Sequence, residues 1–297
     1  MTFMLNTLNR IIILLIIVLI TGCQNESELL NKMGNKDNLS IELKSGGALL
    51  AVSYEITTYQ RYECDFEELT ELDLAHLNPS EEKQRIEMYL MPDGTVNMVI
   101  EELDFERTIN IPHEIAPCDL PKIKRTEIIG NSVTFYDGNR KMLGSHPFQS
   151  IKNEAWADQM SRFDNRLVSE QPAKSFAILQ SCVFGYSIEE MIEDAQVKGQ
   201  FIAHDEHFVT VRTNLSETRQ GATTARVVIV DKSINKVVAS VTYNENEKVI
   251  SRMYFGYQND DIPLLRATVS ETLLEMPSGA EAWQITTSLL ENYKFNN

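Results

Sequence analysis

The sequence predicts an α+β protein that is mainly antiparallel β, with one or more long, curved meander sheets covered by a few helices. Three observations predict it. Apolar and polar residues alternate over most of the chain, which is the period of a half-buried strand. Turn sequences such as Pro92-Asp93-Gly94 separate these runs, so consecutive strands can pair in order. Two segments in the middle of the chain carry the apolar spacing or the capping residues of helices.

The chain begins with a short apolar segment from Ile11 to Ile20, directly after Arg10. A membrane-spanning helix needs about 20 apolar residues, because the hydrocarbon core is about 30 Å thick and a helix rises about 1.5 Å per residue. This segment reaches only about half that length. A basic residue before it and small residues after it are typical of a secretory signal peptide, so residues 1–22 are expected to be removed.

The segment ends in Leu19-Ile20-Thr21-Gly22-Cys23, which resembles the lipobox of bacterial lipoproteins. The resemblance implies that diacylglycerol alkylates the Cys23 thiol, that cleavage occurs just before it, and that the new amino group is acylated, for example with palmitate. Two acyl chains hold a protein stably on a bilayer. The alternative is an ordinary signal peptide in which Cys23 has no role.

Residues 24–40 are polar and lack an apolar period, so we expect a flexible tether between the lipidated cysteine and a globular domain at 41–297. The lipobox resemblance implies an extracytoplasmic protein of the cell envelope, attached to a membrane by lipid. Gln24, where aspartate would favour inner-membrane retention, favours the outer membrane if the host has one.

A formal net charge of −16 repels nucleic acid, so no nucleic-acid partner is expected, and any protein partner stays unidentified. After Cys23 the chain contains Cys64, Cys118 and Cys182, which allow at most one bridge. Cys64 and Cys118 lie in polar, loop-like surroundings, and Cys182 lies in an apolar run where a free thiol packs well. We predict a Cys64–Cys118 disulfide, worth about 4 kcal/mol in the chain-entropy model. Three free thiols are the alternative.

In the first half of the domain, residues 52–58 alternate as a strand, and a short helix is expected within 67–76. Residues 86–100 form the clearest hairpin, and residues 126–136 are expected to form another through Gly130-Asn131. The domain is expected to have two halves that meet near 145–198.

Two helices are expected in this middle region. Trp156, Met160 and Phe163 recur at helical spacing and form an apolar stripe. This stripe is a candidate cover for a ligand cavity; the alternative is a helix that simply covers the core. Ser187 and Glu190 form a capping box, which predicts the start of the second helix.

The last third predicts a run of strands. A hairpin is expected around Asp205-Glu206, three strands are separated by turns at 231–235 and 244–247, and two more meet at 277–279. We expect one strand to carry an apolar face that helices or a ligand must cover, formed by Val237, Ala239, Val241 and Tyr243. The order of elements over 48–295 resembles the half-open barrels of periplasmic lipoprotein carriers, in which a curved sheet holds acyl chains under helices.

No nucleophile elbow, P-loop or zinc-protease motif is present, so no catalytic residue is nominated and an enzyme ranks third. His204 and His207 flank a turn, but a zinc site needs three or four ligands, so no metal or other cofactor is expected. The leading interpretation is a membrane-anchored binding module for a hydrophobic or amphiphilic ligand. The alternative is a structural or interaction lipoprotein with a filled core, which docks on a protein or glycan partner.

Overall fold

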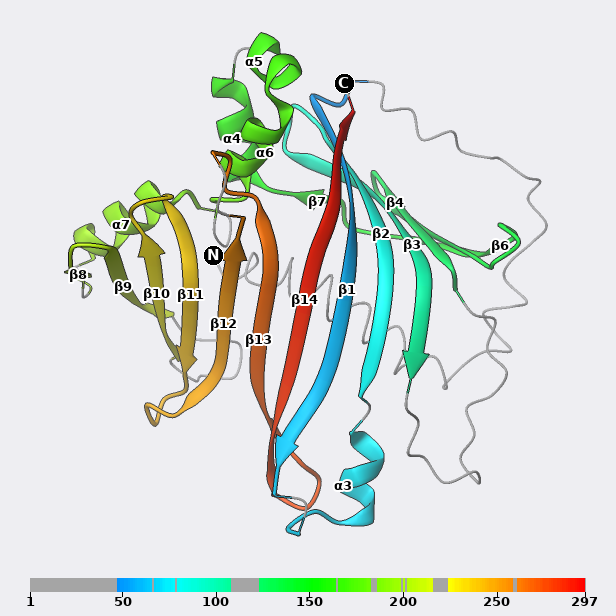
Figure 1. Ribbon diagram of the computed structural model, residues 1–297, viewed down its shortest axis with the longest axis vertical. Helices are drawn as coiled ribbons and strands as arrows, with labels where there is room; N and C mark the ends of the chain where they lie inside the picture. The colour runs from blue at the N-terminus through cyan, green and yellow to red at the C-terminus, as the bar shows by residue number, and fades with distance from the viewer. Residues whose placement is uncertain are drawn as a thin grey trace.

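The computed structural model describes residues 47–65, 67–77, 79–107, 123–163, 165–182, 186–198, 200, 202–215, 224–258 and 261–296. They form one antiparallel 14-stranded sheet with helices packed against it, which confirms the predicted α+β class (Figure 1). Within these ranges, no helix combines the length and apolar character needed to cross a bilayer.

The sheet consists of two meanders. The N-terminal meander contains β1 (Leu50–Cys64), β2 (Ser80–Leu90), β3 (Thr95–Arg107), β4 (Arg125–Ile129), β5 (Ser132–Tyr136) and β6 (Met142–Pro147), and β3 also pairs with β7 (Ile151–Lys152). The C-terminal meander contains β8 (Ile202–His204), β9 (Phe208–Leu215), β10 (Thr224–Asp231), β11 (Lys236–Tyr243), β12 (Val249–Tyr257), β13 (Leu265–Glu275) and β14 (Glu281–Asn296).

The first and last strands join the two meanders. β1 and β14 pair antiparallel from Ala51 opposite Asn296 to Cys64 opposite Ala282. The blue and red strands therefore lie side by side at the centre of the sheet, and β6 and β8 are its ends (Figure 1). The two expected halves consequently form one continuous sheet.

Five helices are described: α3 (Glu71–His76), α4 (Glu154–Arg162), α5 (Asn165–Glu170), α6 (Pro172–Leu179) and α7 (Ile188–Val197). The predicted capping box of α7 is confirmed, since Ser187 and Glu190 each bind the backbone N–H of the other. Helices α5 and α6 were not predicted. The segment of α6 is apolar on most sides, and such a short apolar run does not distinguish a buried helix from a strand.

Helices α4 to α6 gather at one end of the long central strands, and α7 lies beside β8 to β11 (Figure 1). Residues of α4 to α6, including Met160, Phe176 and Leu179, share a core with β1 to β4. Ile188 and Ala195 of α7 share a second core with β9 to β11. The strand registers place both cores on the same face, which we call the inner face; the opposite face is the outer face.

The expected single apolar face of β11 is wrong. Val237 lies opposite Val230, but Ala239 lies opposite Ile229, so the register shifts between these pairs. A bulge inserts one extra residue and reverses the facing of side chains beyond it. Val237 therefore packs in the core under α7, whereas Ala239 and Val241 face outward.

Candidate functional site

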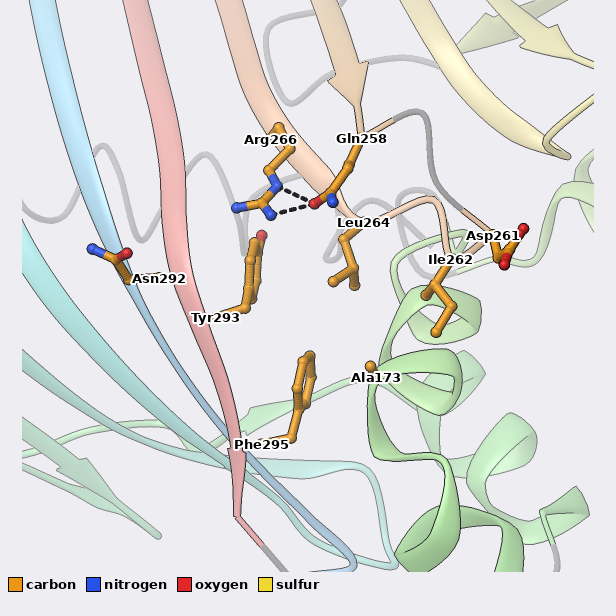
Figure 2. Close-up of a pocket in the computed structure, with 9 residues that line it drawn as sticks. All are labelled: Ala173, Gln258, Asp261, Ile262, Leu264, Arg266, Asn292, Tyr293 and Phe295. Atoms are coloured by element: carbon orange, nitrogen blue, oxygen red, sulfur yellow. Dashed lines mark hydrogen bonds between the residues drawn. The ribbon is translucent and has the colours of Figure 1, made fainter.

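A cavity of about 520 Å³ lies where β12, β13 and β14 approach α6 (Figure 2). The chain reaches it from three separated segments: the start of α6, the connection from β12 into β13, and the end of β14. Its lining combines apolar and polar side chains: Ala173, Gln258, Asp261, Ile262, Leu264, Arg266, Asn292, Tyr293 and Phe295.

Aromatic rings form one wall of the cavity. The rings of Tyr293 and Phe295 are nearly parallel, with an interplanar angle of 6° and centroids 6.2 Å apart. Phe176 lies behind them, with its centroid 6.0 Å from that of Phe295, and Tyr54 lies 5.3 Å from Tyr293. Such contacts add to the stabilisation from burial, so this wall is a fixed part of the fold.

A bulge in β14 directs this wall inward. Glu55 lies opposite Glu291, but Ser53 lies opposite Lys294, so β14 contains one extra residue. Within this bulge Asn292 has a φ of 56°, a left-handed conformation that asparagine tolerates better than most residues. Without this shift, alternation from Glu291 would turn the side chain of Tyr293 to the outer face.

Arg266 contributes a positive charge to the cavity. Its Nε donates to Gln258 Oε1 at 2.6 Å, its Nη2 donates to the same oxygen, and its Nη1 lies 3.5 Å from the Leu290 carbonyl oxygen (Figure 2). Its guanidinium carbon lies 5.4 Å from the centre of the Tyr293 ring. These acceptors are neutral. No ion pair joins Arg266 to a carboxylate within the described part of the chain.

Tyr293 adds no charge at physiological pH. Burial raises the pKa of its phenol to about 12, although Gln180 and Arg266 act in the opposite direction. The hydroxyl donates to the Leu265 carbonyl at 2.6 Å, which ties β14 to the start of β13. The cavity therefore has a mixed lining, in which apolar side chains stand beside one cation, Arg266, one carboxylate, Asp261, and neutral polar groups.

The predicted cover residues belong to the same core but do not line this cavity. Met160 is buried, and Trp156 and Phe163 pack against the same cluster. Trp156 Nε1 donates to the Leu179 carbonyl at 3.0 Å, which joins α4 to the end of α6. The side chain that α6 presents to the cavity is Ala173. The role of the stripe as a ligand cover stays a prediction.

Other predicted residues lie elsewhere. Cys23 and Cys118 fall outside the described residues, so lipidation and the Cys64–Cys118 bridge stay predictions. Cys182 is half-buried, and desolvation raises the pKa of its thiol to about 12. His204 and His207 are exposed at the turn between β8 and β9. The described ranges contain no group of three or more side chains placed to hold a metal ion.

Sequence reasoning missed the cavity residues. The only local signal was Arg266 between the apolar Leu265 and Ala267, and an isolated arginine in a strand is usually exposed. Arg266 belongs to a site because it lies beside Tyr293 and α6. This placement depends on the pairing of strands that are distant in the sequence.

A second hollow, of about 260 Å³, lies by β3 and the turn that follows β5. Its lining is mainly charged, and Lys124 and Glu102 in it form an ion pair at 2.5 Å. It has half the volume of the cavity at Arg266 and no aromatic side chain in its lining, so it fits the expected ligand class less well.

Comparisons with known proteins add a set of distant structural neighbours. No family model and no curated protein matches the chain. A domain assigned to outer membrane lipoprotein sorting, from Vibrio parahaemolyticus, is similar with a TM-score of 0.38 and 9% identity, over 85% of this chain and 88% of that one. A LolA superfamily protein from Nitrosomonas europaea is similar with a TM-score of 0.34 and 9% identity, over 82% of this chain and 86% of that one. A DUF1329 family protein from Desulfovibrio piger is similar with a TM-score of 0.36 and 8% identity, over 85% of this chain and 88% of that one.

Proposed function

We propose that the protein is an extracytoplasmic binding module for an amphiphilic ligand, whose apolar part occupies the cavity beside α6. The observation that carries the proposal is the amphiphilic lining of that cavity: aromatic and aliphatic side chains stand beside polar ones, among which Arg266 contributes a cation. Ligand sites in proteins commonly combine a mostly apolar cavity of about 300–1,000 Å³ with a few placed polar groups.

The size of the cavity suits part of an alkyl chain. Each buried methylene contributes about 0.8 kcal/mol, so about eight methylenes would contribute roughly 6 kcal/mol. Association costs at least about 4 kcal/mol in lost freedom, so a shorter chain would bind too weakly to be retained. We therefore expect a ligand with a medium or long alkyl chain.

Binding of a fluorescent probe with a long alkyl chain tests this proposal. Ala173→Trp places a large ring in the cavity and should reduce probe affinity at least about tenfold, since it removes the space for several methylenes. The matched control is Gln171→Trp, which adds the same ring at an exposed position two residues earlier. If the wild-type protein fails to bind the probe, the alternative of a filled scaffold that docks on a protein or glycan partner is favoured.

We further propose that Cys23 is lipidated and that the tether holds the domain at a membrane of the cell envelope, with the outer membrane favoured. The support is the lipobox resemblance at residues 19–23. Cells that express the protein and are fed radioactive palmitate should label the wild type and not Cys23→Ser. Undiminished labelling of Cys23→Ser would contradict the anchor.

A further inference from the structure

We infer that the ligand carries one anionic group next to its alkyl chain, followed by a neutral, hydroxyl-rich headgroup. This inference rests on the proposed function, because it names the ligand class of the same cavity. It is drawn from the charge at Arg266 and from the uncharged polar side chains that continue from it along the inner face.

Arg266 lies at a boundary on the inner face. On one side are the rings of Tyr293 and Phe295, and on the other side Thr268 follows on the same face of β13. Neutral oxygens occupy N–H groups of Arg266 but do not balance its charge. Arginine binds phosphate and carboxylate through charge-assisted hydrogen bonds about twice as strong as neutral ones. Asp261 also lines the cavity, but it forms no ion pair with Arg266 and its carboxylate points away from the guanidinium (Figure 2). An anion of the ligand beside Arg266 would supply the direct counter-charge that the described residues do not.

The rest of the protein makes this position selective. The net charge of −16 repels anions from most of the surface. An anionic amphiphile therefore gains from placing its charge at Arg266, where the cation adjoins the apolar wall. A ligand with an uncharged end would leave the guanidinium unbalanced beside apolar groups.

Strand register continues the site away from the helices. The next two rows on the inner face run across β13, β14 and β1; they contain Thr268, Ser288 and Thr58, and then Ser270, Thr286 and Gln60. We call these six residues the polar patch. The hydroxyl oxygens of Thr58 and Ser288 lie 3.3 Å apart, in agreement with a shared face. Every residue of the patch is polar and uncharged.

Three hydroxyls of the polar patch have free hydrogen-bonding capacity. Thr268, Ser270 and Thr286 are half-buried, and their hydroxyls bond to no residue within the described ranges. A hydroxyl both donates and accepts, so these groups match the hydroxyls of a polyol or sugar. At about 3.4 Å per residue, the two rows lie roughly 7 and 14 Å beyond Arg266. A neutral headgroup attached to the anion would reach them.

Three lipids with identical short acyl chains separate these contributions. Phosphatidylglycerol has an anion and hydroxyls, phosphatidic acid has the anion alone, and phosphatidylcholine has a phosphate balanced by its own cation and no hydroxyls. Titration calorimetry on the purified protein should give affinities in that order, with phosphatidylglycerol about tenfold or more tighter than phosphatidylcholine.

Variants assign the two effects to residues. Arg266→Gln should lower the affinity for phosphatidylglycerol and for phosphatidic acid about tenfold, and it should change the affinity for phosphatidylcholine little. The double variant Thr268→Val and Thr286→Val should lower the affinity for phosphatidylglycerol to that for phosphatidic acid, since valine keeps the strand shape without the hydroxyl. The matched control is Arg252→Gln, which removes an arginine from the outer face, where Arg252 pairs with Glu271.

Equal affinities for the three lipids, or an Arg266→Gln effect as large on phosphatidylcholine as on the others, would overturn the inference and leave the proposed function intact. Phosphatidic acid binding as tightly as phosphatidylglycerol would overturn the hydroxyl-rich headgroup. If neither the lipids nor the alkyl-chain probe bind, the proposed function itself fails.

Discussion

The burial and the pKa of Lys236 depend on a distant part of the chain. Its side chain is 3% exposed, and its ammonium donates to the Ala177 carbonyl and, at 2.5 Å, to Ser181 Oγ. These acceptors lie at the C-terminal end of α6, where the helix dipole favours a cation. Burial nevertheless lowers the pKa of Lys236 to about 8, with Cys182 acting in the opposite direction.

This pKa predicts a stability profile at alkaline pH. The folded-state pKa of about 8 lies below the ordinary value of 10.5, so between these values the unfolded chain binds more protons and stability rises with pH. Between about pH 7 and 11 the free energy of unfolding should rise by roughly 3 kcal/mol more in wild type than in Lys236→Met. Denaturant unfolding at several pH values measures this, and a constant difference would contradict a buried ammonium.

Sequence could not reveal this burial. Lys236 follows the turn residue Asn235, and a lysine at the start of a hairpin strand normally extends into solvent. It is buried because α6, 59 residues earlier at Ala177, crosses over it. Arg266 is a similar case, since its role depends on Tyr293 and on the bulge at Asn292.

At the scale of elements, α4 provides a prediction about packing. Trp156 is half-buried, so Trp156→Ala should cost about 3 kcal/mol of unfolding free energy, the lower end of the range for buried large-to-small changes. Trp156→Phe keeps most of the packing but leaves the Leu179 carbonyl without its donor, and should cost about 1 kcal/mol. Because Trp156 does not line the cavity, both losses should be the same with and without bound alkyl probe. A loss seen only with probe would show that α4 acts as a lid.

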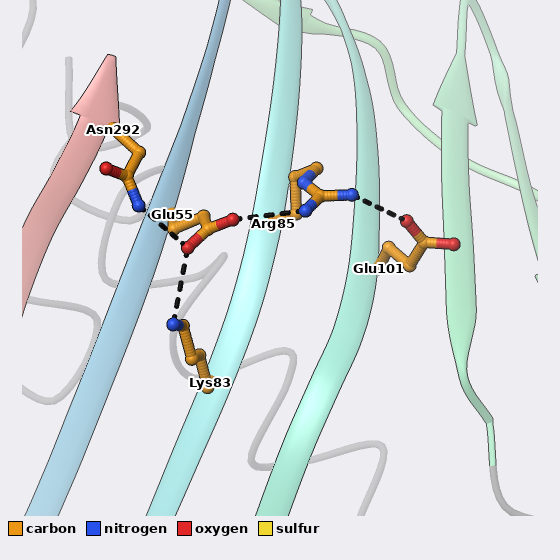
Figure 3. A network of polar contacts seen from close by, with 5 residues as sticks. All are labelled: Glu55, Lys83, Arg85, Glu101 and Asn292. Carbon is orange, nitrogen blue, oxygen red and sulfur yellow. Dashed lines mark hydrogen bonds and ion pairs between the residues drawn. The ribbon is translucent and has the colours of Figure 1, made fainter.

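The long strands are held together by a polar network on the outer face (Figure 3). Glu55 on β1 accepts from Arg85 at 3.1 Å and Asn292 at 3.0 Å and pairs with Lys83 at 3.3 Å, and Arg85 also approaches Glu101 on β3. The network therefore joins β14, β1, β2 and β3. Hydrogen bonds from Arg85 and Asn292, with Lys83 adding to them, lower the pKa of Glu55 to about 2.

This network predicts that the contribution of Glu55 to stability is lost in acid. The folded-state pKa of Glu55 lies below the ordinary 4.5, so its contribution is complete above about pH 4.5 and is lost as the pH falls to about 2. Glu55→Gln should cost about 1 kcal/mol at pH 7, allowing for solvent screening, and little at pH 2. Glu63→Gln on the same strand, where only an exposed pair with Arg61 is lost, is the control. Equal losses at both pH values would contradict the network.

Turn chemistry and alternation were enough to predict the hairpins. The turns at Pro92–Gly94, Gly130-Asn131 and 277–279 all separate paired strands. Bulges were not predictable, because the extra residue in β11 or β14 interrupts the alternation without a composition signal. The apolar face expected for β11 failed for this reason.

At the scale of the whole molecule, the pairing of β1 with β14 organises the protein. It joins two locally paired meanders into one sheet and brings the end of β14 to α6 and β13, where the cavity forms. Local patterns predict which strands follow one another, but they contain no information about the pairing of the first strand with the last. The strand content was therefore readable from the sequence, while the cavity depended on a contact between distant segments.

Native mass spectrometry with lipid extraction, applied to the protein purified from its own host, asks directly whether the cavity beside α6 holds a ligand. We expect one bound amphiphile per chain, with an alkyl chain and an anionic group, in the wild type and in Gln171→Trp. Ala173→Trp, which fills the cavity, should carry no bound amphiphile. A wild-type protein that carries no amphiphile and takes up no phosphatidylglycerol would contradict a ligand site in this cavity.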